Sequence, residues 1–318
     1  MATTIEDSIF GPVPSRRLGR SCGINIIPRK HCSYSCIYCQ IGNTNHLHID
    51  RRTFFDPGTI LRAVETKLEM TRKSNIPVDY FTFVANGEPT LDKNLGDLLE
   101  RSKSLEIKTA LISNASLIQN RSVQELCQKA DWVSLKIDAV QKEIWQKINR
   151  PHPDLRLDQI LNGILAFKKT FQGTLATETM LVRECNDGLN HLTALSQFLA
   201  QLNPDIAYLS IPIRPPAVSR VTAPDAETIN TAYCLIKESI DRVEALTAYE
   251  GNAFDRTGGI EDSILSITSV HPMREDAMEE FLFQGKADWS IVMKMMQEKK
   301  LVRRYFGTHN YYLRPTSG

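Results

Sequence analysis

The sequence has no excess of either charge and no long apolar segment. Its 318 residues include 38 basic and 37 acidic side chains, a formal net charge of +1, so no global field attracts nucleic acid or an anionic membrane. No uncharged apolar run reaches the roughly 18 residues of a membrane span, and residues 1–17 lack the apolar core of a secretory signal peptide. We therefore expect a cytoplasmic protein without a membrane partner, in which any polyanion meets a local basic patch.

Cysteine is also scarce. Seven cysteines in 318 residues are too few for a disulfide framework, and their odd number leaves at least one thiol unpaired. Three of them, Cys32, Cys36 and Cys39, lie close together in the sequence, whereas the other four are scattered. In a reducing cytosol, three clustered thiols favour a metal site over disulfide bonds.

The composition that remains, 42% apolar and 24% charged, is typical of a globular chain with one large core and a small second domain. Apolar runs alternate with helical patterns, and most of the runs show no clean apolar-polar alternation, which indicates a parallel sheet buried on both faces. We predict an α/β fold, a partial (βα)6 barrel similar to a TIM barrel. The expected strands are residues 24–27, 80–84, 108–112, 132–137, 174–182 and 206–213, with 243–249 as a further short candidate.

The composition and the order of the predicted elements change after residue 249. Residues 250–260 are rich in turn-forming residues and are the candidate linker. Beyond it, helical patterns at 275–283 and 289–300 precede two short apolar runs around Gly307, which suggests a winged-helix-like module. We therefore divide the chain into a barrel domain with an N-terminal extension (1–249), the linker, and the module (261–318).

The segment with three cysteines has the spacing Cys-x3-Cys-x2-Cys and follows the first expected strand. Three thiolates on one short loop can hold three irons of a [4Fe-4S] cluster and leave the fourth iron open to a ligand from outside the protein. The alternative is a structural zinc site in which His31, His46 or His48 supplies the fourth ligand.

This loop, with Tyr38 just before its last cysteine, resembles the cysteine loop of the radical S-adenosylmethionine (SAM) superfamily. The resemblance implies that Cys32, Cys36 and Cys39 bind a [4Fe-4S] cluster, that the open iron binds SAM, and that Tyr38 belongs to the cofactor site. It also implies reductive cleavage of SAM to methionine and a 5′-deoxyadenosyl radical that abstracts a substrate hydrogen. The electron would come from a donor such as flavodoxin or ferredoxin.

Two arginines in the segment 11–19, together with Arg214-Pro215-Pro216 after the sixth strand, make the chain similar to the wybutosine-synthesis-like subgroup of that superfamily. This similarity suggests RNA, with a tRNA base as one possibility, as the substrate. Wybutosine-forming enzymes carry further cysteines for a second cluster, whereas here Cys22 stands alone near the first strand.

The carboxyl ends of the strands are the next place to expect site residues, because parallel α/β barrels place their chemistry there. The second strand is followed by Asn86, Gly87 and Glu88, which resemble the Gly-Gly-Glu motif that contacts the SAM amino group, with Asn86 in place of the first glycine. Ser113 and Asn114 follow the third strand and are expected to bind SAM. For Glu88 the alternative is a solvated side chain in a turn. For Ser113 and Asn114 the alternative is the N-cap of the following helix.

Charged residues follow the later strands. Lys136 and Asp138 share one face of the fourth strand, and a buried Lys and Asp must be paired or bound to a ligand. Arg214 follows the sixth strand, where its guanidinium suits a carboxylate or phosphate. We assign Lys136, Asp138 and Arg214 as candidate catalytic residues, with Lys136 also contacting SAM; a structural ion pair is the alternative for Arg214.

Residues 291–318 are basic, with six Lys and Arg residues and one acid, Glu298, and aromatic residues lie among them. Such a segment could bind a phosphate backbone and stack bases, or dock a protein. The sequence therefore predicts a radical SAM enzyme that modifies an RNA base. The alternatives are a radical SAM enzyme acting on a peptide or small metabolite, a nucleic-acid-binding regulator with a sensory cluster, and a zinc-stabilised structural domain.

Overall fold

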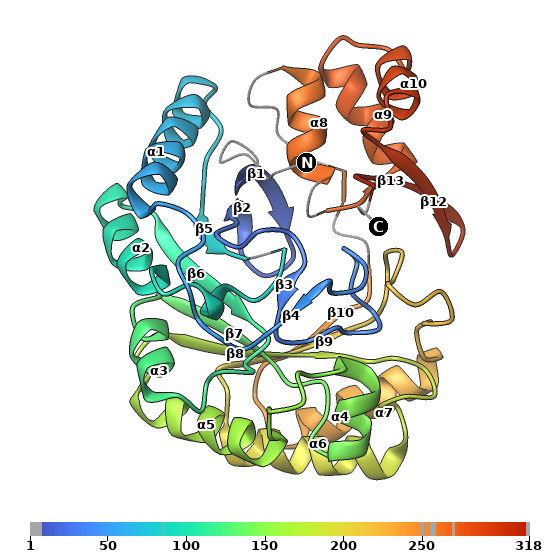
Figure 1. The fold of residues 1–318 in the computed structure, drawn as a ribbon. Coiled ribbons are helices and arrows are strands. Elements are labelled where there is room, and N and C mark those ends of the chain that lie inside the picture. The colour runs from blue at the N-terminus through green and yellow to red at the C-terminus, as the bar shows by residue number, and fades with distance from the viewer. Residues whose placement is uncertain are drawn as a thin grey trace.

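The computed structural model describes residues 8–84, 86–248, 251–252, 254, 259–268 and 271–315. Its main feature is an eight-stranded sheet that curls into an open half-barrel (Figure 1). The first pair of strands is antiparallel and every later pair is parallel, which confirms the predicted α/β class. In sheet order the strands are β1 (Ile9–Ser15), β2 (Gly19–Ile24), β5 (Tyr80–Phe83), β6 (Lys108–Ser113), β7 (Trp132–Lys136), β8 (Thr174–Met180), β9 (Ile206–Ser210) and β10 (Val243–Leu246).

Helices connect the parallel strands and cover the outer face of the sheet (Figure 1). They are α1 (Pro57–Lys73), α2 (Leu95–Ser102), α3 (Arg121–Cys127), α4 (Lys142–Asn149), α5 (Leu157–Thr170), α6 (Leu189–Leu202) and α7 (Ala226–Lys237), with short 3-10 turns at Pro89–Leu91 and Lys103–Leu105. Among the described residues, no helix combines the length and the apolarity that a bilayer crossing requires.

The first parallel strand differs from the prediction, which placed it at residues 24–27. The ladder with β5 runs through residues 21–24 and stops there. Its end has a local cause, because the Asn25 side chain accepts hydrogen bonds from the backbone N–H groups of Ile27, at 3.4 Å, and Asn86, at 3.0 Å. Ile26 and Ile27 are buried in the core but lie beyond the strand.

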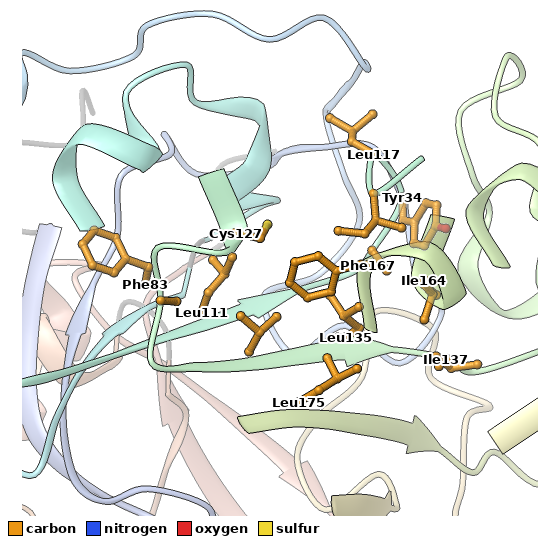
Figure 2. Close-up of a cluster of buried hydrophobic side chains, with 14 of the residues drawn as sticks. Tyr34, Phe83, Leu111, Leu117, Cys127, Leu135, Ile137, Ile164, Phe167 and Leu175 are labelled. Atoms are coloured by element: carbon orange, nitrogen blue, oxygen red, sulfur yellow. The ribbon is translucent and has the colours of Figure 1, made fainter. Parts of the chain in front are cut away.

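The outer face of the sheet packs on the helices. Figure 2 shows Phe83, Leu111, Leu135 and Leu175, one from each of four consecutive strands, in a cluster that includes Phe167 of α5. All five side chains are fully buried and belong to the largest apolar cluster of the chain. This packing fixes which residues of each strand point outward, so the alternate residues must point into the half-barrel.

The inner face carries two sets of side chains. One set is a second apolar cluster, which consists of Leu18, Ala110, Trp132, Ala176, Ile206, Tyr208 and Leu246. The other set lines a cavity and includes the polar or flexible side chains of Thr82, Lys136, Glu178, Met180 and Ser210 together with the apolar Ile112. Lys136, Met180 and Ser210 are the last residues of β7, β8 and β9, so this cavity lies at the carboxyl edge of the sheet.

The C-terminal module has the order α8 (Ile260–Thr268), β11 (Met273–Arg274), α9 (Glu275–Gln284), α10 (Ser290–Gln297), β12 (Val302–Phe306) and β13 (His309–Leu313), with its strands in sheet order β11-β13-β12. It lies beside β1 in Figure 1 (orange and red). Phe10 and Val13 of β1 belong to the apolar core of the module. The predicted linker, residues 250–260, falls largely outside the described residues, and α8 starts at its last position.

Candidate active site

The cysteine loop leaves the carboxyl end of β2 and is tied to its surroundings by backbone hydrogen bonds. Two very short strands, β3 (His31–Cys32) and β4 (His46–Leu47), pair within it. The N–H of Ile37 donates to the carbonyl of Ile148 at 2.9 Å, and that of Ser35 donates to Asn149 at the end of α4. The loop is therefore anchored to α4, a helix that the sequence analysis did not predict because its eight residues bury only Trp145, Ile148 and Asn149.

The thiols of this loop face a cavity of about 360 Å³ at the carboxyl edge of the sheet. The structure brings Cys32, Cys36 and Cys39 together on its wall with residues from β1, β2, β5, β7, β8 and the segment after β9. The predicted site residues that line it with the cysteines are Tyr38, Asn86, Gly87, Lys136 and Arg214. Four others, Glu88, Ser113, Asn114 and Asp138, lie behind this wall.

The chemistry of the donor set fits an iron-sulfur cluster. Burial is the main cause that raises the pKa of all three thiols, to about 12 for Cys36, so metal binding would have to displace their protons. The Asn114 amide donates to Cys32 Sγ at 3.5 Å, and the Asn149 amide donates to Cys36 Sγ at 3.4 Å. Amide donors of this kind tune cluster sulfurs. In the described part of the chain, no three His, Cys, Asp or Glu side chains form a ready single-ion site.

Backbone hydrogen bonds join the segment Asn86–Gly87–Glu88 to the cysteine loop. The Lys30 N–H donates to the Asn86 carbonyl at 2.9 Å, and the Glu88 N–H donates to the His31 carbonyl at 3.2 Å. A Cβ atom at Gly87 would overlap that same His31 oxygen, so only glycine allows the approach. The Asn86 side chain is 3% exposed, and its Oδ1 has no hydrogen-bond partner in the structure.

Glu88 points away from the cavity. Its Oε1 accepts hydrogen bonds from the N–H and hydroxyl of Thr90 and from the Ser113 hydroxyl, at 2.6–3.0 Å, and its Oε2 accepts the Asn114 N–H at 2.7 Å. Burial raises the pKa of Glu88 despite these donors. Through these donors Glu88 joins the ends of β5 and β6, and its predicted contact with the SAM ammonium group stays a prediction.

Asn114 and Ser113 also act on the loop. The Asn114 amide donates to Ser33 Oγ at 2.9 Å in addition to Cys32, and Ser113 is engaged by Glu88. Neither residue lines the cavity. Asn114 thus contacts the cysteine loop directly and Ser113 contacts Glu88, and their predicted contact with SAM stays a prediction.

Lys136 lies at the centre of a buried charge cluster on the cavity floor. Its Nζ is 3.2 Å from Glu178 Oε1 and 3.9 Å from Asp138 Oδ1, and it lies 4.9 Å from the centre of the Tyr38 ring. Burial lowers the pKa of Lys136, but the carboxylates of Glu178 and Asp138 outweigh it and raise the pKa. Lys136 is therefore a permanent cation in contact with the cavity.

Glu178 balances that charge. It is 4% exposed, pairs with Arg17 as well as Lys136, and accepts the Ser210 hydroxyl at 3.1 Å. Burial alone would raise the pKa of Glu178, yet the two cations hold it far below its usual range. Arg17 and Glu178 are site residues that no sequence motif indicated, although Glu178 lies directly opposite Lys136 in the β7–β8 register.

Asp138 is buried and engaged on all sides. Its carboxylate accepts hydrogen bonds from the Tyr38 hydroxyl, from the Asn149 amide at 2.7 Å and from the Met180 N–H at 2.9 Å. It does not line the cavity. Asp138 holds Tyr38 and Asn149 beside the cysteine loop through these hydrogen bonds, and its predicted catalytic role stays a prediction.

Arg214 links the cysteine loop to the C-terminal module. Its Nη1 donates to Gln40 Oε1 at 2.6 Å, and its Nη2 is 3.0 Å from His271 Nε2. Because a guanidinium only donates, His271 Nε2 must accept, and its Nδ1 donates to the Pro272 carbonyl at 3.3 Å. Burial and then Arg214 lower the pKa of His271, which agrees with a neutral ring. His271 lines the cavity and was missed by sequence reasoning.

Comparison with known proteins agrees with this geometry. The family model described as Radical SAM superfamily matches residues 26–190, from just after β2 into α6. A UPF0026 protein of Methanocaldococcus jannaschii is 42% identical over 307 residues, which cover 96% of this chain and 95% of that protein. A UPF0026 protein of Synechocystis sp. is 37% identical over 222 residues, covering 69% of this chain and 80% of that protein.

Among solved structures, TYW1 with a lysine-pyruvate adduct bound is similar in fold. The match has a TM-score of 0.52 at 14% identity and covers 70% of this chain and 76% of that chain. At this identity the match concerns the fold alone. The family match spans the cysteine loop and the carboxyl ends of β5, β6, β7 and β8, so this chain is an enzyme of the radical SAM superfamily, whose members use a [4Fe-4S] cluster and SAM.

Proposed function

We propose that Cys32, Cys36 and Cys39 hold three irons of the cluster and that the fourth iron faces the cavity, where SAM binds. The observation that carries this proposal is that all three thiols line one cavity with Gly87 and Lys136. In this superfamily the cluster and SAM together supply a 5′-deoxyadenosyl radical, which abstracts a hydrogen atom from the substrate.

The side chains around the thiols have separate tasks in this proposal. Asn86 offers an unpartnered buried carbonyl oxygen that suits the SAM ammonium group, and Gly87 lets the backbone approach the ligand closely. Lys136 supplies a fixed positive charge for the SAM carboxylate, and Tyr38 forms the wall beside it. Arg214 faces the remaining volume and suits an anionic group of the substrate.

Anaerobic incubation with SAM and dithionite tests this assignment. The reconstituted protein should contain about four irons and form 5′-deoxyadenosine. Cys36→Ala should lose the cluster and the product, whereas Cys234→Ala, which changes an exposed cysteine on α7, should keep both. Full iron content and product in Cys36→Ala would overturn the assignment.

For the substrate, we propose an RNA base, with the wybutosine-synthesis-like subgroup as the affiliation and the cytoplasm as the location. The order of the module's elements, α8, β11, α9, α10, β12 and β13, supports the proposal of a winged-helix-like module with β12 and β13 as the wing. Arg303, Arg304 and Tyr305 are exposed on β12, whereas Tyr311 and Tyr312 are buried and are not exposed for base stacking. Domain boundaries near 249 and 261 are part of this proposal, as is a flavodoxin or ferredoxin as electron donor.

RNA binding should be tested by substitution rather than by deletion of the module, because Phe10 and Val13 of the barrel domain belong to the core of the module. The measurement is the affinity for bulk tRNA by filter binding. Reversal of the two exposed wing charges, Arg303→Glu with Arg304→Glu, should weaken binding at least tenfold. Unchanged affinity would leave a peptide or small metabolite as the substrate class.

A further inference from the structure

The cysteine loop ends in a turn that is held by a side chain from a distant segment. The carbonyl of Cys39 accepts the N–H of Gly42 at 3.0 Å, so residues 39–42 form a β-turn with Gln40 at its second position. The Gln40 side chain accepts a hydrogen bond from Arg214 Nη1 at 2.6 Å, across 174 residues of sequence. The placement of the turn that follows the last thiol therefore depends on Arg214.

The C-terminal module holds Arg214 at both its side chain and its backbone. His271 of the module accepts a hydrogen bond from Arg214 Nη2 at 3.0 Å. The Tyr311 hydroxyl, also of the module, donates to the carbonyl of Ile213, the residue before Arg214, at 2.6 Å. These two contacts fix the guanidinium group and the chain that carries it, so Gln40 meets a donor whose position is set by the module.

The surroundings of His271 make its ring an acceptor for Arg214. The ring is 7% exposed and stands edge-on to Phe254, with 5.1 Å between the ring centres. Its Nδ1 lies 3.3 Å from the carbonyl of Pro272. A carbonyl only accepts, so Nδ1 carries the proton, and Nε2 presents its lone pair to the guanidinium group.

The two partners that hold the guanidinium group of Arg214 are uncharged. One is the side-chain amide of Gln40 and the other is the neutral ring of His271. A carboxylate would also fix a guanidinium group, but it would cancel the positive charge. Arg214 and His271 line the same cavity as the three thiols, so this arrangement orients the side chain of Arg214 and keeps its charge available to the cavity.

We propose that His271 is a positioning residue of the active site, which holds Arg214 against the turn at residues 39–42 and thereby makes the C-terminal module part of the cluster site. The inference rests on the proposed function, in which Cys39 binds the cluster. Coupling between two sites is reciprocal. The docked module should therefore stabilise the loaded cysteine loop, and the loaded loop should stabilise the docked module.

The test uses four variants of the full chain. His271→Leu removes the acceptor for Arg214, and His271→Gln can return one through its amide oxygen. Gln40→Ala breaks the same link from the side of the loop and leaves the module intact, so it keeps the test decisive if His271→Leu does not fold. The control is Tyr312→Phe, which removes a hydroxyl that donates to Glu275 Oε1 at 2.9 Å within the module. Thermal melts show which variants are folded.

The measurement is amide hydrogen exchange in residues 271–274 and 309–313, with and without the cluster, under anaerobic conditions. In the wild-type protein and in His271→Gln, the cluster should slow this exchange by about fivefold or more, which is the lower end of coupling between linked sites. In His271→Leu and Gln40→Ala the slowing should be lost, and a chelator should remove the bound iron faster. Tyr312→Phe should exchange faster in both states and keep its response to the cluster.

An unchanged response to the cluster in both His271→Leu and Gln40→Ala would overturn the inference. An equal loss of response in Tyr312→Phe would also overturn it, because the effect would then come from general weakening of the module. A wild-type protein that loads a cluster and forms 5′-deoxyadenosine, but whose module does not respond to the cluster, would overturn this inference and leave the proposed function standing. A wild-type protein that takes up no cluster would overturn the assignment of the cysteines and this inference with it.

Discussion

At the scale of single residues, Gly87 shows how closely the strand end and the cysteine loop approach. We expect Gly87→Ala to displace the His31 carbonyl, because the added methyl group overlaps it. The free energy of unfolding should fall by about 1–3 kcal/mol, as for other overpacked sites. The iron bound after anaerobic reconstitution should fall as well, because His31 adjoins Cys32.

Gly188 provides the matched control for that substitution. It precedes α6 with a backbone conformation that alanine adopts freely, and nothing lies within 4 Å of the position of an added Cβ. Gly188→Ala should leave the iron content unchanged and lower the free energy of unfolding by less than about 1 kcal/mol, because alanine is a weaker N-cap of α6 than glycine. Equal behaviour of the two variants would refute the close approach at Gly87.

Glu178 should make stability depend on pH. Arg17 and Lys136 lower its pKa against the effect of burial, so the folded state stays ionised where the unfolded chain, with a pKa of about 4.3, already takes up a proton. The stabilisation is thus complete above that pKa and is lost as the pH falls toward the folded value. Glu178→Gln should cost about 3–5 kcal/mol at pH 7, because it leaves buried cations unpaired.

Urea unfolding of wild type and Glu178→Gln between pH 3 and 7 checks this sign. The difference between the two proteins should be largest near pH 7 and should shrink below about pH 4. Glu125→Gln, which alters an exposed pair on α3, should show no such trend. A difference that stayed constant with pH would contradict the depressed pKa.

Part of this residue-level chemistry was predictable and part was not. The pattern at Lys136 and Asp138 predicted a buried lysine that needs a partner, and the structure places carboxylates there. The principal partner, Glu178, is 42 residues from Lys136 and 161 from Arg17, so its contacts depend on the strand register. His271 belongs to the C-terminal module, and the sequence around it has no motif that would place its side chain at the cavity.

At the scale of elements, the Tyr311 hydroxyl joins β13 to the segment that follows β9 of the barrel. Tyr311→Phe should remove the hydrogen bond to the Ile213 carbonyl and destabilise the protein by about 0.5–1.5 kcal/mol. Amide hydrogen exchange should become faster in β11 and β13. Tyr305→Phe, which removes a hydroxyl from a side chain that is 71% exposed, should change neither quantity; faster exchange in both variants would argue against a specific docking contact.

The helices that the sequence predicts best are those in which apolar residues recur at helical spacing over several turns. In α1, the apolar residues Ile60, Leu61, Val64 and Leu68 recur at helical spacing, and all four are buried. The helix α4 has too few buried positions to produce a period, and α8 follows directly on glycines that indicate a turn. The end of β2 depended on a side-chain contact between Asn25 and Asn86, which are distant in sequence.

At the scale of the whole molecule, binding of SAM should raise the free energy of unfolding. With the cluster reconstituted under anaerobic conditions, SAM at about 100 times its Kd should stabilise the protein by about 2.7 kcal/mol, because only the folded cavity binds it. Calorimetric melts with and without SAM measure this. Cys36→Ala should show no SAM-dependent change in Tm, and an undiminished change would mean that SAM binds elsewhere.

The position of α8 on β1 has a consequence for association between copies of the chain. β1 is one of the two edge strands of the eight-stranded sheet, β10 being the other, and the Ser266 hydroxyl of α8 donates to the Ile9 carbonyl at 3.4 Å. Exposed outer strands recruit strands from other molecules and seed aggregates. The helix α8 covers β1 and so prevents such strand pairing. Nascent or proteolysed chains that lack residues 260–268 would therefore be prone to pair edge to edge, with Phe10 and Val13 forming the contact surface.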